Sequence, residues 1–300
     1  MVVSGVTGVV GRRLVPLLRA DGATVVGLSR SAARAEGRVP ELSEAIRWAG
    51  AGSPLEDGAL DGAQAVVHLA GEPVAGRWTD AKKERIESSR VQGTARIVDA
   101  IERAKDGPSV LVSASAMGIY GDRGDDLLSE DEPAATDFLA RVCAGWEREA
   151  LRAESLGVRV VRLRIGLVLA TQGGALAQLL PIFRGGIGGR IGSGAQYWSW
   201  IHLDDMCGVI REALRRDDMS GAYNVCVPTS VRQRDFAKVL GGVLGRPAVV
   251  PTPAFALKAA LGGFAAEILG SRRLVPARLV EAGYQYRHPE LQAALEDLLG

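Results

Sequence analysis

The sequence predicts an α/β fold, a doubly wound parallel sheet joined to a smaller, mostly helical C-terminal lobe. Short valine-rich runs alternate with longer helix-like stretches up to about residue 165, which is the rhythm of parallel strands joined by crossover helices. Beyond that point the alternation weakens, and residues 228–300 have mostly helical patterns. A 300-residue chain with 47% hydrophobic residues can build the sizeable core that such a fold needs.

Seven strands and four long helices are expected from these patterns. The strands are Met1–Val3, Thr24–Leu28, Ala45–Trp48, Ala65–Leu69, Val110–Val112, Val158–Leu163 and Tyr223–Val227. The helices are Arg12–Ala20, Thr79–Arg103, Phe138–Ser155 and one that Asp204 or Asp205 caps and that runs to Arg216. The first strand is short, and a longer natural start would extend it without altering the site.

Composition excludes several functions. Lys plus Arg is 36 against 35 Asp plus Glu, so neither nucleic acid nor an anionic membrane surface is an expected partner. The three cysteines are far apart and form no CxxC pair, as in a reducing compartment. With no targeting segment or long apolar run, we expect a cytoplasmic protein, and with only three scattered histidines we expect no metal site.

Three evenly spaced glycines, Gly5, Gly8 and Gly11, lie between the first strand and the first helix. A simple turn also uses glycine. At the start of a helix, however, free backbone N–H groups and the helix dipole favour a pyrophosphate. We therefore expect a dinucleotide contact along Gly5, Thr7, Gly8, Val9, Val10 and Gly11.

The second strand ends in Ser29 and Arg30, where an NAD-binding chain usually has an acidic residue for the ribose 2′-hydroxyl. A guanidinium at this position can form charge-assisted bonds with a 2′-phosphate, with help from Arg34 or Arg12. This favours NADP(H) over NAD(H). The alternative is a solvated surface arginine.

Further motifs span nearly the whole chain. They are Val66-Val-His-Leu-Ala-Gly71, Gly71-Glu-Pro-Val-Ala-Gly-Arg-Trp78, Ser113-Ala-Ser-Ala-Met-Gly-Ile-Tyr-Gly121, Gly194-Ala-Gln-Tyr-Trp-Ser-Trp-Ile-His-Leu-Asp-Asp205 and Pro276-Ala-Arg-Leu-Val-Glu-Ala-Gly283. With the glycine triplet, they make the chain resemble an atypical extended short-chain dehydrogenase/reductase, in the branch of epimerase family proteins related to nucleotide-sugar epimerases.

The resemblance implies a Rossmann domain over residues 1–227 that binds NADP(H), with a glycine-rich substrate-side insertion at about 172–200. It also implies a small C-terminal domain over residues 228–300 that contacts a small-molecule substrate, such as a nucleotide sugar. The oligomeric state is left open between a monomer and a homodimer. Further cofactor contacts carried over from the family are Leu69, Ala70, Gly71, Glu72, Arg90, Ser113 and Arg164.

The chain lacks the Tyr-x-x-x-Lys pair with which extended dehydrogenases exchange protons at a carbinol. Leu139 and Cys143 align with the tyrosine and the lysine, and no lysine lies between Lys105 and Lys238. The family asparagine before a Val-x-Gly-Thr segment is replaced by Arg90. The usual acid is therefore absent, and a fixed positive charge is added.

Two interpretations are compatible with this pattern. In the first, Arg90 positions cofactor or an anionic substrate while Ser115 and Tyr120 handle the proton, so that the chain is an oxidoreductase with a different catalytic constellation. In the second, the chain is a non-catalytic NADP(H) sensor or regulator. For Trp198, Trp200 and His202, core packing is favoured over ligand stacking or acid-base chemistry.

Overall fold

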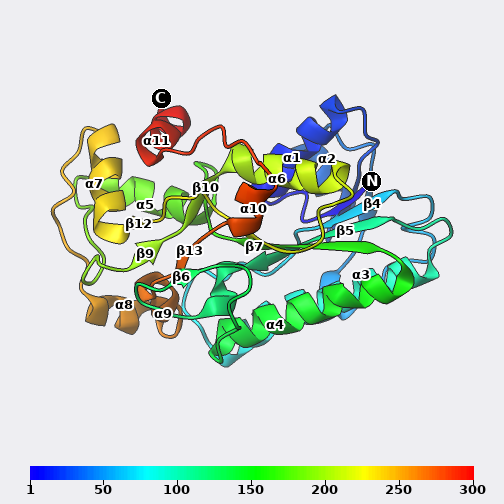
Figure 1. Cartoon of the computed structure of the whole chain (residues 1–300), viewed down its shortest axis with the longest axis horizontal. Helices are drawn as coiled ribbons and strands as arrows, with labels where there is room; N and C mark the ends of the chain where they lie inside the picture. The colour runs from blue at the N-terminus through cyan, green and yellow to red at the C-terminus, as the bar shows by residue number, and fades with distance from the viewer.

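The computed structural model describes residues 1–300 and has a seven-stranded, all-parallel sheet at its centre, with the order β11-β7-β5-β4-β1-β2-β3 (Figure 1). Its strands are β1 (Val2–Ser4), β2 (Val26–Ser29), β3 (Glu44–Arg47), β4 (Ala65–His68), β5 (Val110–Ala116), β7 (Arg159–Ile165) and β11 (Gly221–Val225). The order reverses beside β1, which is the switch point where ligands bind in open α/β sheets. The predicted fold class is confirmed.

Helices cover both faces of this sheet (Figure 1). On one face, α1 (Val9–Ala20), α2 (Ala32–Arg38) and α6 (Leu203–Arg215) contribute to the largest hydrophobic cluster. On the other, α3 (Asp80–Arg103) and α4 (Phe138–Leu151) pack against a second cluster around Leu111 and Val160. Because both faces are buried, the central strands β1, β4 and β5 begin with continuous apolar runs rather than alternating ones.

A third hydrophobic cluster forms the smaller lobe, at the left of Figure 1. It joins Phe183 and Trp200 to Phe236 and Leu295, so the lobe is built from two stretches of the chain. The sequence assigned the earlier stretch, about 172–200, to the larger domain as an insertion. The lobe's helices are α5 (Gly174–Arg184), α7 (Gln233–Val243), α8 (Ala254–Leu261), α9 (Phe264–Leu269) and α11 (Leu291–Leu299), while α10 (Ala277–Glu281) packs against the sheet's cluster.

Three short ladders lie outside the central sheet. They pair β8 (Leu167–Leu169) with β10 (Trp200–His202), β9 (Tyr197–Trp198) with β12 (Val231–Arg232), and β6 (Leu127–Leu128) with β13 (Arg273–Leu274). Trp198 and Trp200 are 9% and 1% exposed within the lobe's core, as the core-packing interpretation expects. None of the helices is long and apolar enough to cross a membrane.

The prediction that Asp204 or Asp205 caps helix α6 is wrong. The cap is His202, whose Nδ1 accepts a hydrogen bond from the N–H of Asp204. Asp205 is fully buried and accepts instead from the N–H groups of Arg287 and His288. The carboxylate therefore fastens the C-terminal segment to α6, a long-range contact that local sequence patterns do not reveal.

Candidate functional site

The glycine loop brings three backbone segments into close contact. Gly5 has φ +73°, and a Cβ there would lie 2.9 Å from the backbone of Leu69 and Ala70. A Cβ on Gly11 would lie 2.7 Å from the Cα of Val6 and would overlap the carbonyl oxygen of Gly5. Neither position accepts a side chain, so the start of α1 lies directly on the loop.

The start of α1 is open to an anion. Its N-cap, Gly8, provides no side-chain hydrogen bond, and the first turn carries no acidic residue. The orphan N–H groups and the positive end of the helix dipole are therefore not neutralised by the protein itself. These are the properties of a phosphate-binding helix start.

Ser4 and His68 hold the loop against the end of β4. The Oγ of Ser4 accepts hydrogen bonds from the N–H groups of Leu69 (3.1 Å) and Ala70 (3.2 Å). It also lies 2.6 Å from Nδ1 of His68, which is fully buried. Both oxygen lone pairs are used, so the hydroxyl proton goes to Nδ1. Burial and the charge of Arg90 lower the pKa of His68 to about 4, so the ring is neutral.

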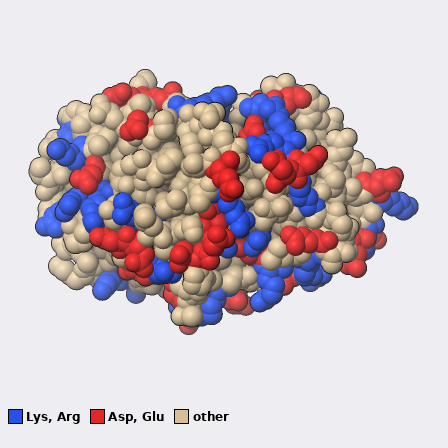
Figure 2. Space-filling view, viewed as in Figure 1, with Lys and Arg blue, Asp and Glu red and all other residues tan.

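At the end of β2, Ser29 is half-buried and Arg30 is exposed. Arg30 forms no ion pair with any carboxylate of the chain, whereas Arg13 binds Asp204 through two hydrogen bonds. The guanidinium of Arg30 is thus available to a ligand. Charges of both signs are otherwise interspersed, and the face drawn in Figure 2 has no continuous basic surface.

Arg90 reaches the loop after β4 from helix α3. Its Nη1 donates to the carbonyl oxygens of Glu72 (3.0 Å) and Ile86 (3.1 Å), and its guanidinium lies over the ring of Trp146. A Cβ on Gly71 would be 3.3 Å from its Cζ. No carboxylate neutralises Arg90, and burial lowers its pKa. The structure therefore brings Arg90, Gly71 and Glu72 together.

Glu72 itself is paired by helix α3. Its Oε1 accepts from Lys82 at 2.8 Å, and Arg85 lies 3.6 Å away. The hydrogen bond from Lys82 holds the pKa of Glu72 below its ordinary value. Sequence analysis did not identify Lys82. Its position in the first turn of the long helix that follows the Gly71–Trp78 motif could have indicated that it lies near Glu72.

Ser115 and Arg164 lie in a buried network around Glu147. The carboxylate accepts from Ser115 Oγ (2.7 Å), from Arg162 Nη1 (2.7 Å), and from Nε and Nη2 of Arg164 (2.9 and 3.1 Å). Burial alone would raise the pKa of Glu147, but Arg164, Ser115 and Arg162 outweigh it and hold the pKa below its ordinary value. The side chains of Ser115 and Arg164 are thus occupied within the protein.

Tyr120 extends the network to strand β11 and to the segment around Val275. Its hydroxyl donates to Asn224 Oδ1 (2.7 Å) and accepts from Arg164 Nη1 (2.9 Å). The Nδ2 of Asn224 donates in turn to the carbonyl oxygen of Val275, and Arg164 also donates to the backbone of Glu130. Burial raises the pKa of Tyr120 to about 12. The phenol is fully buried and protonated near neutral pH.

The positions expected for the missing dyad are apolar in the structure. Leu139 and Cys143 are buried on α4, and a Cβ on Gly118 would lie within 3.8 Å of both side chains. Burial raises the pKa of Cys143 to about 12, so it is a thiol rather than a thiolate. Ser113, on β5, is also buried and donates to the backbone of Ala114.

The structure also gathers two histidines that the sequence treated as scattered. His202 and His288 stack with centroids 3.9 Å apart, and ligand atoms of His202, Asp204 and His288 lie within 4.8 Å of one another. Several of these ligand atoms already contact other groups of the protein. Nδ1 of His202 accepts from the Asp204 N–H, its Nε2 lies 3.3 Å from Asp297, and both Asp204 oxygens accept from Arg13. The arrangement fastens the C-terminal segment rather than forming a ready metal site.

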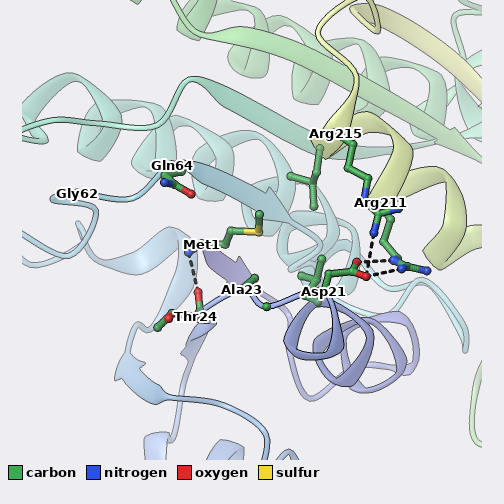
Figure 3. A pocket seen from close by; sticks show the side chains of 11 residues that line it. Met1, Asp21, Ala23, Thr24, Gly62, Gln64, Arg211 and Arg215 are labelled. Carbon is green, nitrogen blue, oxygen red and sulfur yellow. Dashed lines mark hydrogen bonds and ion pairs between the residues drawn. The ribbon is translucent and has the colours of Figure 1, made fainter.

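A cavity of about 520 Å³ lies at the opposite, amino edge of the sheet (Figure 3). Met1, Thr24 and Gln64 line it where their strands begin, and the carboxylate of Asp21 pairs with Arg211 and Arg215. A single carboxylate, that of Asp21, thus pairs with both arginines of the cavity. The cavity is separate from the glycine loop, which lies at the carboxyl edge.

Comparisons with known proteins agree with this geometry. Residues 1–226 match the model of the NAD dependent epimerase/dehydratase family, and residues 252–298 match a domain of unknown function, DUF1731. The "Epimerase family protein SDR39U1 homolog, chloroplastic" of Arabidopsis thaliana is 40% identical, with 99% of this chain and 86% of that protein covered.

Two solved structures are also similar. The crystal structure of human epimerase family protein SDR39U1 with NADPH has a TM-score of 0.89 and 33% identity, covering 99% of this chain and 98% of that one. MoeE5 in complex with UDP-glucose and NAD has a TM-score of 0.79 at 22% identity, covering 99% and 96%, and shares the fold.

Proposed function

Because the chain belongs to the NAD-dependent epimerase/dehydratase family, within the extended short-chain dehydrogenases, we propose that it is an NADP(H)-dependent oxidoreductase. The observation that carries this proposal is the glycine loop. Its backbone leaves no room for a Cβ at Gly5 or Gly11, and it opens an uncapped helix without acidic residues. A dinucleotide pyrophosphate fits this cradle.

We assign the cofactor contacts to Gly5, Thr7, Gly8, Val9, Val10 and Gly11, to Leu69, Ala70, Gly71 and Glu72 at the end of β4, and to Ser29 and Arg30. The unpaired guanidinium of Arg30 supports NADP(H) over NAD(H), because it supplies the positive charge that a 2′-phosphate needs. Residues 1–227 form the cofactor domain in this proposal, and residues 228–300, with the stretch 172–200, contact the substrate.

NADP(H) would supply the hydride chemistry at a small carbonyl or carbinol compound, and nucleotide sugars are the first class to test. Arg90 is the best-supported residue for the reacting end. It is positively charged, lies against Gly71 and lacks a carboxylate partner, so it can orient an anionic or carbonyl group of the substrate. Ser115, Tyr120 and Arg164 support the site from within the Glu147 network, and Ser113 from strand β5.

Turnover is tested with a panel of nucleotide sugars and small carbonyl compounds, by following the absorbance of NADPH. Oxidation with one member supports the proposal and identifies the substrate class, and Arg90→Met should then reduce the rate more than it reduces NADPH affinity. Tight NADPH binding without oxidation anywhere in the panel would contradict the oxidoreductase and support a cofactor sensor.

One prediction tests the cofactor assignment without a substrate. Arg30→Glu should weaken NADPH binding at least tenfold more than NADH binding, because it replaces an attraction to the 2′-phosphate with a repulsion. Fluorescence titration of both cofactors measures this. Unchanged NADPH affinity would refute the role of Arg30.

A further inference from the structure

Three arginines surround the carboxyl ends of β2 and β3. Arg30 directly follows β2, Arg34 is in the first turn of α2, and Arg47 is the last residue of β3. All three are exposed. None forms an ion pair, and none donates a side-chain hydrogen bond within the chain. This contrasts with Arg13, which binds Asp204 on α6, and with Arg211, which binds Asp21 just after α1.

The strand register places Arg47 beside Ser29. The two residues are direct partners in the parallel ladder between β2 and β3, where neighbouring strands lie about 4.8 Å apart. Side chains alternate along a strand, so Arg47 shares a sheet face with Ala45. Ala45 packs in the cluster that contains α1 and α2, whereas Ile46 packs against the cluster of the opposite face. Arg47 thus lies on the same face as Ser29 and helix α2.

The charge at this corner exceeds what one arginine supplies. A phosphomonoester carries about −1.5 to −2 charges near neutral pH, so a single guanidinium leaves it only partly neutralised. Three unpaired guanidinium groups from a strand end, a helix and the neighbouring strand can surround such a group. The inference rests on the proposed binding of NADP(H).

We propose that Arg47 is a second contact for the 2′-phosphate of NADP(H), and that it sets cofactor specificity together with Arg30. The 2′-phosphate would then be bound by a residue of β3 as well as by the residue that follows β2. Glu44 is the nearest acidic residue on β3 and lies at the other end of that strand, so no carboxylate of β3 opposes the contact.

Arg47→Ala tests the proposal, with Arg38→Ala as the matched control. Arg38 is also exposed and unpaired but ends α2, at the opposite end from Arg34. We expect Arg47→Ala to weaken NADPH and 2′,5′-ADP about tenfold, to leave NADH and 5′-AMP within twofold, and to reduce the salt dependence of NADPH binding. Arg38→Ala should change none of these values.

The outcomes separate this inference from the proposed function. In one outcome, the natural chain prefers NADPH and Arg30→Glu abolishes that preference, but Arg47→Ala has no more effect than Arg38→Ala. This outcome would refute the role of Arg47 and would leave the proposed NADP(H) binding intact. An equal loss of NADPH and NADH affinity in Arg47→Ala would also refute it. If the natural chain does not prefer NADPH over NADH, the proposed cofactor fails first, and the inference fails with it.

Discussion

Acidification from pH 7 to pH 5 should destabilise the protein through His68. The ring is fully buried, and its pKa is lowered from 6.5 to about 4. The unfolded chain therefore takes up a proton that the folded chain does not, and stability falls as the pH falls between these two values. Linkage gives a loss of about 2 kcal/mol at pH 5 relative to pH 7 from this residue.

The local consequence comes from the hydrogen bond to Ser4. A protonated Nδ1 could no longer accept the hydrogen bond from the Ser4 hydroxyl. The Ser4 oxygen could not accept from Nδ1 instead, because it already accepts from the N–H groups of Leu69 and Ala70. In the folded state, the proton therefore disrupts the contact that holds the end of β4 against the glycine loop. Because the folded ring takes up this proton only near pH 4, NADPH affinity should hold between pH 7 and pH 5 and decline as the pH approaches 4.

Urea unfolding at several pH values tests this prediction, with His68→Asn for comparison. The Asn Oδ1 can still accept from Ser4 but does not titrate. Between pH 7 and pH 5, the free energy of unfolding of the variant should fall by about 2 kcal/mol less than that of the natural chain, since contributions from all other groups cancel in the comparison. Equal losses in both proteins would refute the buried neutral histidine. Should the variant not fold, NMR titration of the His68 ring gives the same answer.

Two further predictions concern packing and buried charge. Gly11→Ala should abolish NADPH binding and lower the thermal unfolding midpoint, because the new Cβ would lie 2.7 Å from the Cα of Val6. Calorimetry with and without NADPH measures both effects. An NADPH affinity close to that of the natural chain would contradict this prediction. Glu147→Gln should cost about 3–5 kcal/mol in the free energy of unfolding, because it leaves two arginines without their carboxylate. Asp218→Asn, in the exposed pair with Arg216, is the control for urea unfolding, and similar effects of the two substitutions would argue against the network.

The sheet was predictable because its signals are local. Most strands are short runs rich in valine or other apolar residues, and each long helix has an apolar face that ends near a glycine or a polar residue. The positions of the glycine triplet and of Arg30 could also be predicted from the sequence, because each is set by the end of a strand and the start of the helix that follows it. These residues required no knowledge of distant contacts.

The buried networks were not predictable, because they join residues far apart in the chain. Nothing local indicates that Glu147 accepts from Ser115, Arg162 and Arg164, or that His202 rather than an aspartate caps α6. Ser115 was expected at the site because it lies at the end of a predicted strand, and Arg164 was carried over from the family resemblance. Their roles at a reacting group stay predictions, while their contacts within the protein are clear.

The most direct measurement is the ratio of the NADH and NADPH dissociation constants for the natural chain and for Arg30→Glu, at one pH and salt concentration. We expect the natural chain to bind NADPH much more tightly than NADH, and we expect this ratio to fall to one or below in Arg30→Glu. Equal affinities in the natural chain would contradict it, and failure of both cofactors to bind would overturn the assignment of the glycine loop as well.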